Sequence, residues 1–578
     1  MILQALTKCY EDLLKREAIA PPGWSLTNIS YALCLNSEGK LLQIVSTMEE
    51  TTNGKKTVFR PQKMTLPTAV KRSSGVASNF LWDNSSYLLG IDQKGKPKRS
   101  LECFQNASVL HHAVLDSVDT DMAKAILKFF DTWDPEHALE NEALAESYEE
   151  VTGTANLVFR VNGEFSQDDV EIKKAWNQYQ KKENTDGIRM QCLVTGQEDE
   201  IPPIHAAIKG VRDAQSSGAA LVSFNAPAFC SYGHEQNFNA PVGKYAATAY
   251  TAALNYLLAD RDNVQMIGDT TVVCWADGAD PVYQQFSMAA LFGNTPETGL
   301  TDNDLRSALR NIAEGFPCED LKLDPNRPFY ILGLAPNSAR LSVRFFYRDT
   351  FGSLMRNIND HYERLEMIRP AYEKFEILPI WALLRETVNL NSRDKSASPV
   401  MSGAVARAIF SGGRYPASLL EAVMIRIHAE RKITWGRASI LKAYYLKNTN
   451  QDCPKEVLTV SLNEASTNPA YTLGRLFSVY EAVQQDANPG INTTIRDKYF
   501  NSASAMPSSI FPILANLYQK HLRKLEKGKQ IYYDKQVSAL KGVLGEEYPT
   551  RMTLAQQGAF DLGYYHQTQK RYTKKEEQ

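Results

Sequence analysis

Three residues of this sequence have types and positions that suit catalysis. His234 and Glu235 lie in the polar stretch SYGHEQNFN and could transfer protons. Asp277 follows the apolar run TTVVCWA, so its carboxylate would lie at the carboxyl end of a strand, where α/β active sites commonly form. However, adjacent side chains seldom converge on one substrate, and one carboxylate does not make a site. The alternative for SYGHEQNFN is a polar loop packed on the body of the protein.

Motifs that define common enzyme classes are missing from the sequence. It contains no GxxxxGK[ST] phosphate loop, no HExxH zinc helix and no GxSxG nucleophile turn. In the pair His111–His112, which lies in a helical stretch, we expect one packed ring and one solvated ring rather than metal ligands. The eight cysteines are scattered singly, which is typical of reduced thiols in a cytoplasmic protein. We therefore expect no catalytic residue, no metal and no cofactor.

Binding of polyanions is the chemistry that the sequence offers instead, and it is local. The chain carries 64 Lys and Arg against 66 Asp and Glu, a formal net charge of −2, so the molecule as a whole has no strong attraction to nucleic acid. Between Arg60 and Arg99, however, eight basic residues stand against only Asp83 and Asp92. The acidic stretch 131–151 would repel phosphate. Any nucleic-acid site must therefore be confined to particular segments.

The stretch KRSSGVASNFLWDNSS within the basic segment combines phosphate binding with base recognition. Adjacent cations can neutralise phosphates, and serine hydroxyls with a glycine backbone can donate to phosphate oxygens at close approach. Asparagine amides can make bidentate contacts to adenine edges or contact minor-groove acceptors. The alternative is a surface loop in which Asn84 only forms a turn. The candidate DNA-binding residues are Lys71, Arg72, Ser73, Ser74, Gly75, Asn79 and Asn84.

Two further groups of cations are candidates for the nucleic-acid backbone. In the expected hairpin PFYILGLAPNSARLSVRFFYRD, a period of two places Arg340, Arg344 and Arg348 on one face and the apolar residues Leu341, Val343, Phe345 and Tyr347 on the other. We expect these arginines to contact nucleic acid or an acidic protein surface; a solvated or salt-bridged strand face is the alternative. The second group lies in KHLRKLEKGK and comprises Lys520, Arg523, Lys524 and Lys527.

The periodicities predict an α+β fold. A helix is expected over Ile2–Leu14, hairpins around Asn36–Gly39 and Asn162–Gly163, and buried strands at LVSFN and TTVVCWA. After about residue 390 the pattern becomes helical. Since 578 residues exceed a single core, we expect a mixed α/β region over 1–390, with a subdivision near 150, and a helical bundle over 391–578. No signal peptide or membrane span is expected.

Five stretches carry a resemblance to a known family. They are NFLWDNSSYLLG, SFNAPAFCSYGHEQNFNAPVGKYAATAYTAALNYLL, FYILGLAPNSARLSVRFFYRDTFGSL, RYPASLLEAVMIRIHAERKITWGRASILKAYYL and TNPAYTLGRLFSVYE. In this order, over the whole length, the sequence resembles the large subunit of the type I-C CRISPR interference complex, Cascade.

The resemblance implies a noncatalytic subunit of a CRISPR RNA (crRNA)-guided surveillance complex. Such a subunit recognises a short flanking motif, the PAM, on double-stranded target DNA and assists strand separation and R-loop formation. The implied partners are crRNA, the backbone, crRNA-processing and small subunits, the displaced non-target strand and a helicase-nuclease recruited later. The family also implies that a segment from about 457 to 578 is made separately as the small subunit. Two alternatives remain open: an enzyme that acts on nucleic acid through His234, Glu235 or Asp277, and a purely structural assembly scaffold.

Overall fold

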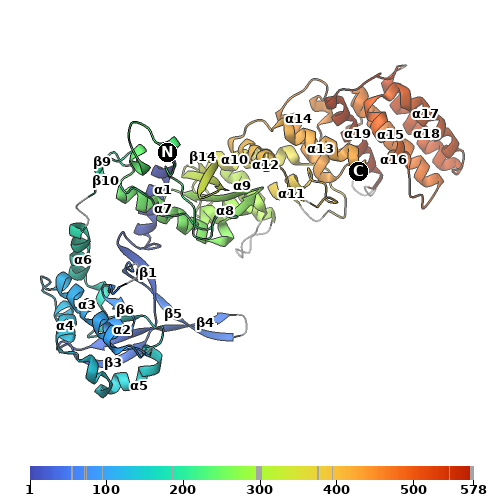
Figure 1. Ribbon diagram of the computed structural model, residues 1–578. Helices are drawn as coiled ribbons and strands as arrows, with labels where there is room; N and C mark the ends of the chain where they lie inside the picture. Colours follow the sequence, from blue (N-terminus) through green and yellow to red (C-terminus); the bar gives the residue numbers. More distant parts are fainter. Residues whose placement is uncertain are drawn as a thin grey trace. The chain divides into compact units, whose positions relative to one another are not determined.

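The protein forms two compact units (Figure 1). Unit 1 comprises residues 1–206 and 222–256, and unit 2 comprises residues 207–221 and 257–578. The computed structural model describes residues 1–53, 56–70, 72, 75–93, 95–183, 187–293, 302–373, 376–393, 395–545 and 547–572. Among the candidate site residues, Lys71, Ser73 and Ser74 therefore lie outside the described residues.

Unit 1 is built around two sheets. The larger sheet has the strand order β3-β2-β7-β6, with β8 beside β7, and only the β2–β7 pair is parallel. The smaller sheet has the order β1-β5-β4 and is antiparallel. Their strands are β1 (Trp24–Ile29), β2 (Tyr31–Leu35), β3 (Leu41–Ser46), β4 (Met48–Asn53), β5 (Lys56–Pro67), β6 (Trp82–Asp83), β7 (Leu157–Val161) and β8 (Glu164–Phe165).

Both hairpins predicted for this unit are present, since their turns carry the expected residues. Asn36 accepts hydrogen bonds from the backbone N–H groups of Glu38 and Lys40, and Gly39 has a φ of +76°. Asn162 and Gly163 both have positive φ, as a two-residue hairpin turn requires. A third short pair joins β9 (Arg189–Gln191) and β10 (Glu198–Glu200).

Helices complete the core of unit 1. In this core, the ring of His111 packs against Phe130 and Phe159, and Phe159 also packs against Phe129. Burial lowers the pKa of His111 to about 4, whereas the partly exposed His112 pairs with Asp116 and Asp131, so one ring is packed and one is solvated as predicted. The helices are α1 (Ile2–Lys15), α2 (Ser85–Leu88), α3 (Pro97–Leu115), α4 (Asp121–Thr132), α5 (Glu142–Val151), α6 (Val170–Glu183) and α7 (Lys244–Ala259), whose last turn belongs to unit 2.

Unit 2 begins with an antiparallel sheet of order β11-β12-β13-β14. The strands are β11 (Gln265–Ile267), β12 (Thr270–Ala276), β13 (Pro328–Asn337) and β14 (Arg340–Thr350). Every residue of β12 is buried, as its unbroken apolar run predicts. The segment 207–221 adds to the free side of β14, where Ala220 bonds to Ala339 and Leu341 through their backbones. By contrast, LVSFN (221–225) is not a strand, so that prediction was wrong.

A β-bulge in β14 changes which side chains share a face. Val343 lies opposite Leu334 and Phe345 lies opposite Gly333, so Arg344 is the extra residue. Directly opposed residues share a face of the sheet, so the bulge moves Phe345 to the core face, while Val343 lies on the other face and is exposed. The predicted grouping of Leu341, Val343, Phe345 and Tyr347 on one face is therefore wrong, because a strict period of two does not continue past an inserted residue.

The rest of unit 2 is helical, and the helical pattern predicted after about residue 390 is confirmed by α12 to α19. One continuous core runs from the sheet through these helices, and the predicted domain boundary near residue 390 lies inside it. The helices are α8 (Pro281–Phe292), α9 (Asp302–Ala313), α10 (Phe351–Leu365), α11 (Ile380–Arg385), α12 (Pro399–Ser411), α13 (Ala417–Glu430), α14 (Trp435–Lys447), α15 (Pro469–Ala487), α16 (Ile495–Ala505), α17 (Pro507–Leu522), α18 (Lys527–Leu544) and α19 (Leu554–Tyr572).

At the end of α10, hydrogen bonds connect the sheet-containing part of unit 2 to the helices α14 and α19. The buried ammonium group of Lys442 on α14 donates to the carbonyl oxygens of Glu363, Arg364 and Glu366. These carbonyls lie in and directly after the last turn of α10, where a helix leaves carbonyl groups without full backbone pairing. Tyr565 on α19 donates to the next segment, at the carbonyl oxygen of Ile368. Polar side chains thus join α10, α14 and α19 at one point.

Helices α15 and α19 are in backbone contact. A Cβ atom added to Gly474 would lie 1.9 Å from the carbonyl oxygen of Phe560, and one added to Gly563 would lie 2.1 Å from that of Tyr471. Only glycine permits two helices to approach so closely. Farther along, the buried carboxylate of Glu481 accepts hydrogen bonds from Tyr564 and Thr494, which adds a polar link between α15, α16 and α19.

We predict that Gly474→Ala lowers the free energy of unfolding by about 1–3 kcal/mol or more, because the added methyl group meets backbone that cannot move aside. Thermal unfolding of the full-length chain measures this effect. Gly528→Ala in α18 is the matched control, since nothing lies within 4 Å of its added Cβ. The control should be neutral or stabilising, because alanine favours the helix. Equal melting temperatures for the two variants would contradict the close contact.

Candidate nucleic-acid interface

The buried carboxylate of Asp83 organises the loop that contains most of the candidate DNA-binding residues. It accepts two hydrogen bonds from the guanidinium group of Arg72, one of them 3.1 Å long. It also accepts from the backbone N–H groups of Asn79 at 2.9 Å and Asn84 at 2.8 Å. Burial raises the pKa of Asp83, and the guanidinium group and the two N–H donors oppose this effect. One side chain thereby holds three points along the loop.

Arg72 is largely occupied by these internal contacts. Besides Asp83, its guanidinium group donates to the carbonyl oxygen of Ala77 and lies 4.0 Å from the centre of the Tyr87 ring. A planar group with a carboxylate at its edge and an aromatic ring on its face has little capacity left for a phosphate. The structure therefore gives Arg72 a positioning role. This role was not predicted, because the ion pair depends on burial of Asp83.

The two candidate asparagines differ in what remains available to DNA. Asn79 is only 4% exposed, and its side-chain oxygen accepts from the N–H of Val70, so this side chain positions the loop and does not reach the surface. Asn84 is half-buried, and its side-chain oxygen caps α2 by accepting from the N–H of Ser86 at 3.0 Å. Its amide nitrogen donates to no residue that the structure describes. Asn84 thus combines the predicted turn with a donor that can still reach a base.

Aromatic residues hold the loop against the core. Phe80 stacks on Trp176 with ring centres 4.7 Å apart, and the Trp82 indole donates to the carbonyl of Pro67. Between them, Leu81 has a φ of +67°, which is uncommon for a residue other than glycine, and its N–H donates to the buried ring of His111. Such a conformation persists only where its surroundings enforce it. The loop therefore presents Asn84 from a fixed position.

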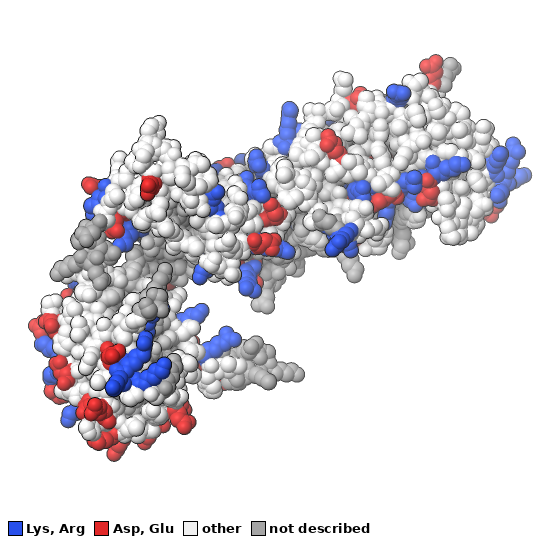
Figure 2. All heavy atoms as spheres, viewed as in Figure 1, with Lys and Arg blue, Asp and Glu red and all other residues white. Residues whose placement is uncertain are grey.

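A cavity of about 360 Å³ opens beside Asn84. Three cations and the N-terminus of α3 border it, and Figure 2 shows basic side chains gathered on one face of unit 1 with acidic ones around them. We did not predict site residues among Lys96, Arg99 and Ser100. The signal that could have placed them at a helix start is Pro97, because proline is favoured in the first turn of a helix. The lining residues are Arg72, Gly75, Asn84, Ser86, Tyr87, Asp92, Lys96, Arg99, Ser100 and Cys103.

The three candidate arginines of β14 do not form one free basic face. Arg344 makes an ion pair with Asp269 at 2.7 Å, so the expectation that these arginines avoid internal ion pairs is wrong for this residue. Arg348 lies above the ring of Tyr330, 5.9 Å from its centre. Arg344 occupies the inserted position of the bulge, and Arg340 already takes part in an interaction within the protein. The strand β14 is therefore a weaker candidate for nucleic-acid binding than the loop.

The cations of the C-terminal helices are more accessible. Lys520, Arg523, Lys524 and Lys527, at the junction of α17 and α18, are all exposed. Lys524 makes one hydrogen bond, to the side-chain oxygen of Asn488 at 3.2 Å. Figure 2 shows basic side chains grouped at the end of unit 2 where α17 and α18 lie.

The catalytic candidates do not form a site in either unit. His234 and Glu235 lie in an exposed loop of unit 1, which is closed by Asn239 through hydrogen bonds to Ser231 and His234. Asp277 follows β12 in unit 2, as predicted, and is half-buried. In the part of the chain that the structure describes, no group of three or more His, Cys, Asp or Glu side chains could hold a metal ion.

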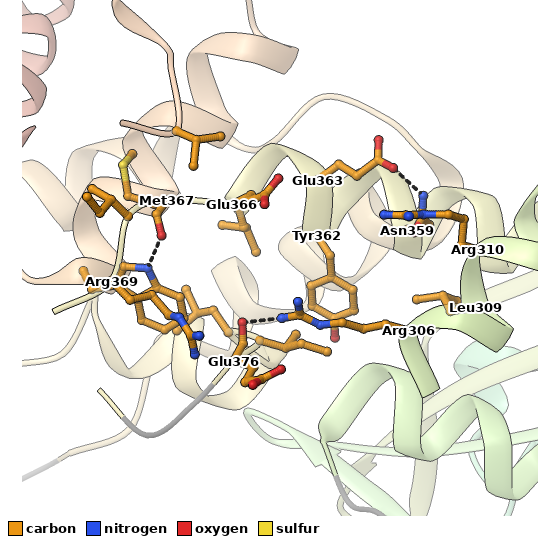
Figure 3. Close-up of a pocket in the computed structure, with 16 residues that line it drawn as sticks. Arg306, Leu309, Arg310, Asn359, Tyr362, Glu363, Glu366, Met367, Arg369 and Glu376 are labelled. Atoms are coloured by element: carbon orange, nitrogen blue, oxygen red, sulfur yellow. Dashed lines mark hydrogen bonds between the residues drawn. The ribbon is translucent and has the colours of Figure 1, made fainter. Parts of the chain in front are cut away.

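A second cavity, of about 350 Å³, lies between α9, α10 and the segment that follows α10 (Figure 3). Several polar groups of this cavity bind the segment that follows α10. Arg306 donates to the carbonyl oxygen of Glu376, and the Trp435 indole donates to the carbonyl oxygen of Met367. Arginine and glutamate side chains line it in equal numbers, so it has no net attraction for a polyanion.

We predict that Arg72→Ala lowers the free energy of unfolding by about 2–3 kcal/mol, since it leaves the Asp83 carboxylate buried without its cation. Loss of the cation raises the pKa of Asp83 further, so the destabilisation should shrink as the pH falls and the carboxyl group takes up a proton. Chemical denaturation between pH 4 and 8 measures both effects. The double variant Arg72→Ala with Asp83→Asn should recover part of the loss, and Lys98→Ala, at an exposed residue, is the control. Equal stability of Arg72→Ala and Lys98→Ala would refute the role of this pair.

Comparison with known proteins identifies the family. Among the described residues, no helix is both long and apolar enough to cross a membrane. No curated protein matches the sequence. A protein-family model described as "CRISPR-associated protein (Cas_Csd1)" matches residues 6–572, nearly the whole chain, in agreement with the resemblance to the type I-C Cascade large subunit. The chain therefore belongs to the Cas_Csd1 family of CRISPR-associated proteins.

Proposed function

We propose that this protein is the noncatalytic large subunit of a crRNA-guided complex and recognises the PAM on double-stranded target DNA. The observation that carries the proposal is the loop held by Asp83, which presents the Asn84 amide at the edge of a basic cavity. Family membership supports work with other CRISPR-associated components. In this proposal, guide pairing reads the long target and the protein reads only the flanking motif.

The Asn84 amide is the proposed base-reading group. Its oxygen is used by the cap, so the nitrogen is left to donate to an acceptor on a base edge. Gly75 and the cations of the cavity rim would contact the neighbouring backbone. Lys71, Ser73 and Ser74 are proposed to contribute phosphate contacts from the same loop. Arg72 and Asn79 are proposed to act by holding that loop.

We predict that Asn84→Ser weakens binding of the assembled complex to DNA with the preferred PAM by about 1–3 kcal/mol, with a smaller loss on a scrambled PAM. Serine retains the cap, so the melting temperature should change little. Asn84→Ala is the comparison, because it removes the cap as well and should also lower the melting temperature, by an amount that corresponds to about 1 kcal/mol. Equal losses on both PAMs for Asn84→Ser would show that Asn84 does not read a base.

The helices α17 and α18 are proposed to lie along the displaced strand. Seven basic residues between Lys520 and Lys541 stand against only Glu526 and Asp534, and Asp534 accepts a hydrogen bond from Tyr518. Clustered cations of this kind can bind the phosphates of a single strand, with a strong dependence on salt. Helicase-nuclease recruitment would follow R-loop formation, as the family resemblance implies.

We predict that the triple variant Lys520→Ala, Lys524→Ala and Lys527→Ala lowers the slope of log affinity against log salt by up to about two units for R-loop formation, roughly 0.7 for each phosphate contact to a single strand. Filter binding at several salt concentrations measures the slope. The control is Lys124→Ala with Lys128→Ala, which removes exposed cations that pair with Asp119 and Glu38. Equal slopes for the triple variant and the control would place the displaced strand elsewhere.

The segment from about 457 to 578 is proposed to be produced also as a separate small subunit. In support, α15 packs against α16, α17, α18 and α19, so these helices contact one another within the continuous core of unit 2. The contacts of α19 with Ile368 and with Tyr445 on α14 would be exposed in such a fragment. Intact-mass analysis of the purified complex tests for a product of roughly 120 residues, within the size range of helical domains that fold alone.

Two other functions, an enzyme and a structural scaffold, would each be shown by a different experimental result. Metal-dependent cleavage of DNA by the purified chain, lost on changing His234 or Asp277, would show an enzyme. Normal assembly with unchanged DNA binding after removal of Asn84 and the basic cavity rim would show a purely structural scaffold.

A further inference from the structure

The N-terminus of α3 lacks the partners that usually complete a helix start. Lys96 occupies the N-cap position without a side-chain hydrogen bond, and Pro97 has no N–H to donate. The N–H groups of Lys98 and Arg99 donate to no acceptor among the residues that the structure describes. The N–H of Ser100 is the first to be satisfied, by the carbonyl of Lys96. The N–H of Arg99, a residue that lines the cavity, and the positive end of the helix dipole together favour an anion at this helix start.

An independent observation points to the same ligand. Ser100 is only 1% exposed and lines the cavity beside Asn84, yet its hydroxyl group has no hydrogen-bond partner among the described residues. A buried hydroxyl without a partner costs about 1–3 kcal/mol, so most such groups are satisfied. A ligand in the cavity would supply the missing acceptor.

Charged groups around the cavity define what the ligand must be. Lys96 and Arg99 are exposed at its rim, and Arg99 donates one hydrogen bond to the carbonyl of Gly75 at 3.3 Å. Arg72 is neutralised by Asp83. The one acid that lines the cavity, Asp92, accepts a hydrogen bond from Ser86 at 3.3 Å. The net charge of the rim is thus positive, and the donors converge on the helix start.

We propose that this cavity holds one phosphate group of the DNA backbone next to the PAM. The N–H group of Arg99 and the hydroxyl of Ser100 donate to its oxygens, while Lys96 and Arg99 neutralise its charge. A volume of about 360 Å³ is roughly ten times that of a water molecule in the liquid, so the attached sugar fits as well. The choice of DNA as the source of the phosphate rests on the proposed function. The contact fixes the register of the duplex in which Asn84 meets one particular base pair.

The test combines chemical changes in the DNA with changes in the protein. In target duplexes, single phosphates around the PAM are replaced one at a time by neutral methylphosphonates, and binding to the assembled complex is measured. One position should weaken binding by the wild-type complex roughly tenfold or more, as for hydrogen bonds to a charged group. The same replacement should have little further effect in complexes with Ser100→Ala or with Lys96→Ala and Arg99→Ala. Lys98→Ala is the matched control, because its side chain does not line the cavity, and it should keep the full sensitivity.

A second measurement separates this proposal from the proposed function. Full-length chain without partners is heated in the presence of inorganic phosphate, a 5′-phosphorylated dinucleotide or its 5′-hydroxyl form. Inorganic phosphate and the phosphorylated dinucleotide should raise the melting temperature of the wild-type chain but not of Ser100→Ala. In the absence of ligand, Ser100→Ala should melt at the same or a higher temperature, since it removes an unpaired buried hydroxyl.

The outcomes are distinct. Stabilisation by phosphate combined with failure of the complex to bind DNA would refute the proposed function and retain the anion site. Stabilisation only by the 5′-phosphorylated dinucleotide, with no effect of any methylphosphonate, would replace the backbone phosphate by a terminal one and overturn the proposal as stated. Binding that is insensitive to every methylphosphonate, without stabilisation by any phosphate, would refute the site itself.

Discussion

The order of the candidate DNA-binding loop depends on one buried carboxylate. Asp83 receives donors from Arg72, Asn79 and Asn84, which come from the beginning, middle and end of the loop. A carboxylate removed from water needs such donors, and a loop without regular backbone bonding needs an acceptor for its N–H groups. The loop N–H groups supply donors to the carboxylate, and the carboxylate supplies the acceptor for those N–H groups. The position of the Asn84 amide at the edge of the basic cavity follows from this arrangement.

Much of the fold could be predicted because it depends on local chemistry. The hairpin turns at Asn36–Gly39 and Asn162–Gly163 need residues that tolerate positive φ, and those residues are visible in the sequence. The strand β12 could be predicted from its unbroken apolar run, and the later helices from their period. In β14, by contrast, the inserted Arg344 depends on register with β13. Such a shift is decided by partners distant in sequence, so alternation alone assigned the faces incorrectly.

The candidate site was predictable in its charge and not in its geometry. Counting cations located the segment from Arg60 to Arg99, but counting does not show that Arg72 is neutralised by Asp83. Two asparagines of equal chemistry have different roles, because Asn79 is buried against Val70 and Asn84 stands at a helix start. Burial decides which polar groups remain available, and burial is a property of the folded chain. Ser100 illustrates the same point, since an isolated serine in a helix carries no signal in the sequence.

The division of the chain into units has a consequence for how the protein is made. Residues 207–221 belong to unit 2, although unit 1 continues at residue 222. In unit 2, Ala220 bonds to the backbone of Ala339 and Leu341. On the ribosome, the segment must therefore wait for more than a hundred further residues to emerge before its strand partner exists. During that interval the backbone groups of Ala220 that bond to Ala339 and Leu341 have no partner there, so synthesis passes through a stage that is vulnerable to proteases and mispairing. Expression of a truncated chain that ends before β14 would hold the protein at this stage, with the segment 207–221 lacking its partner.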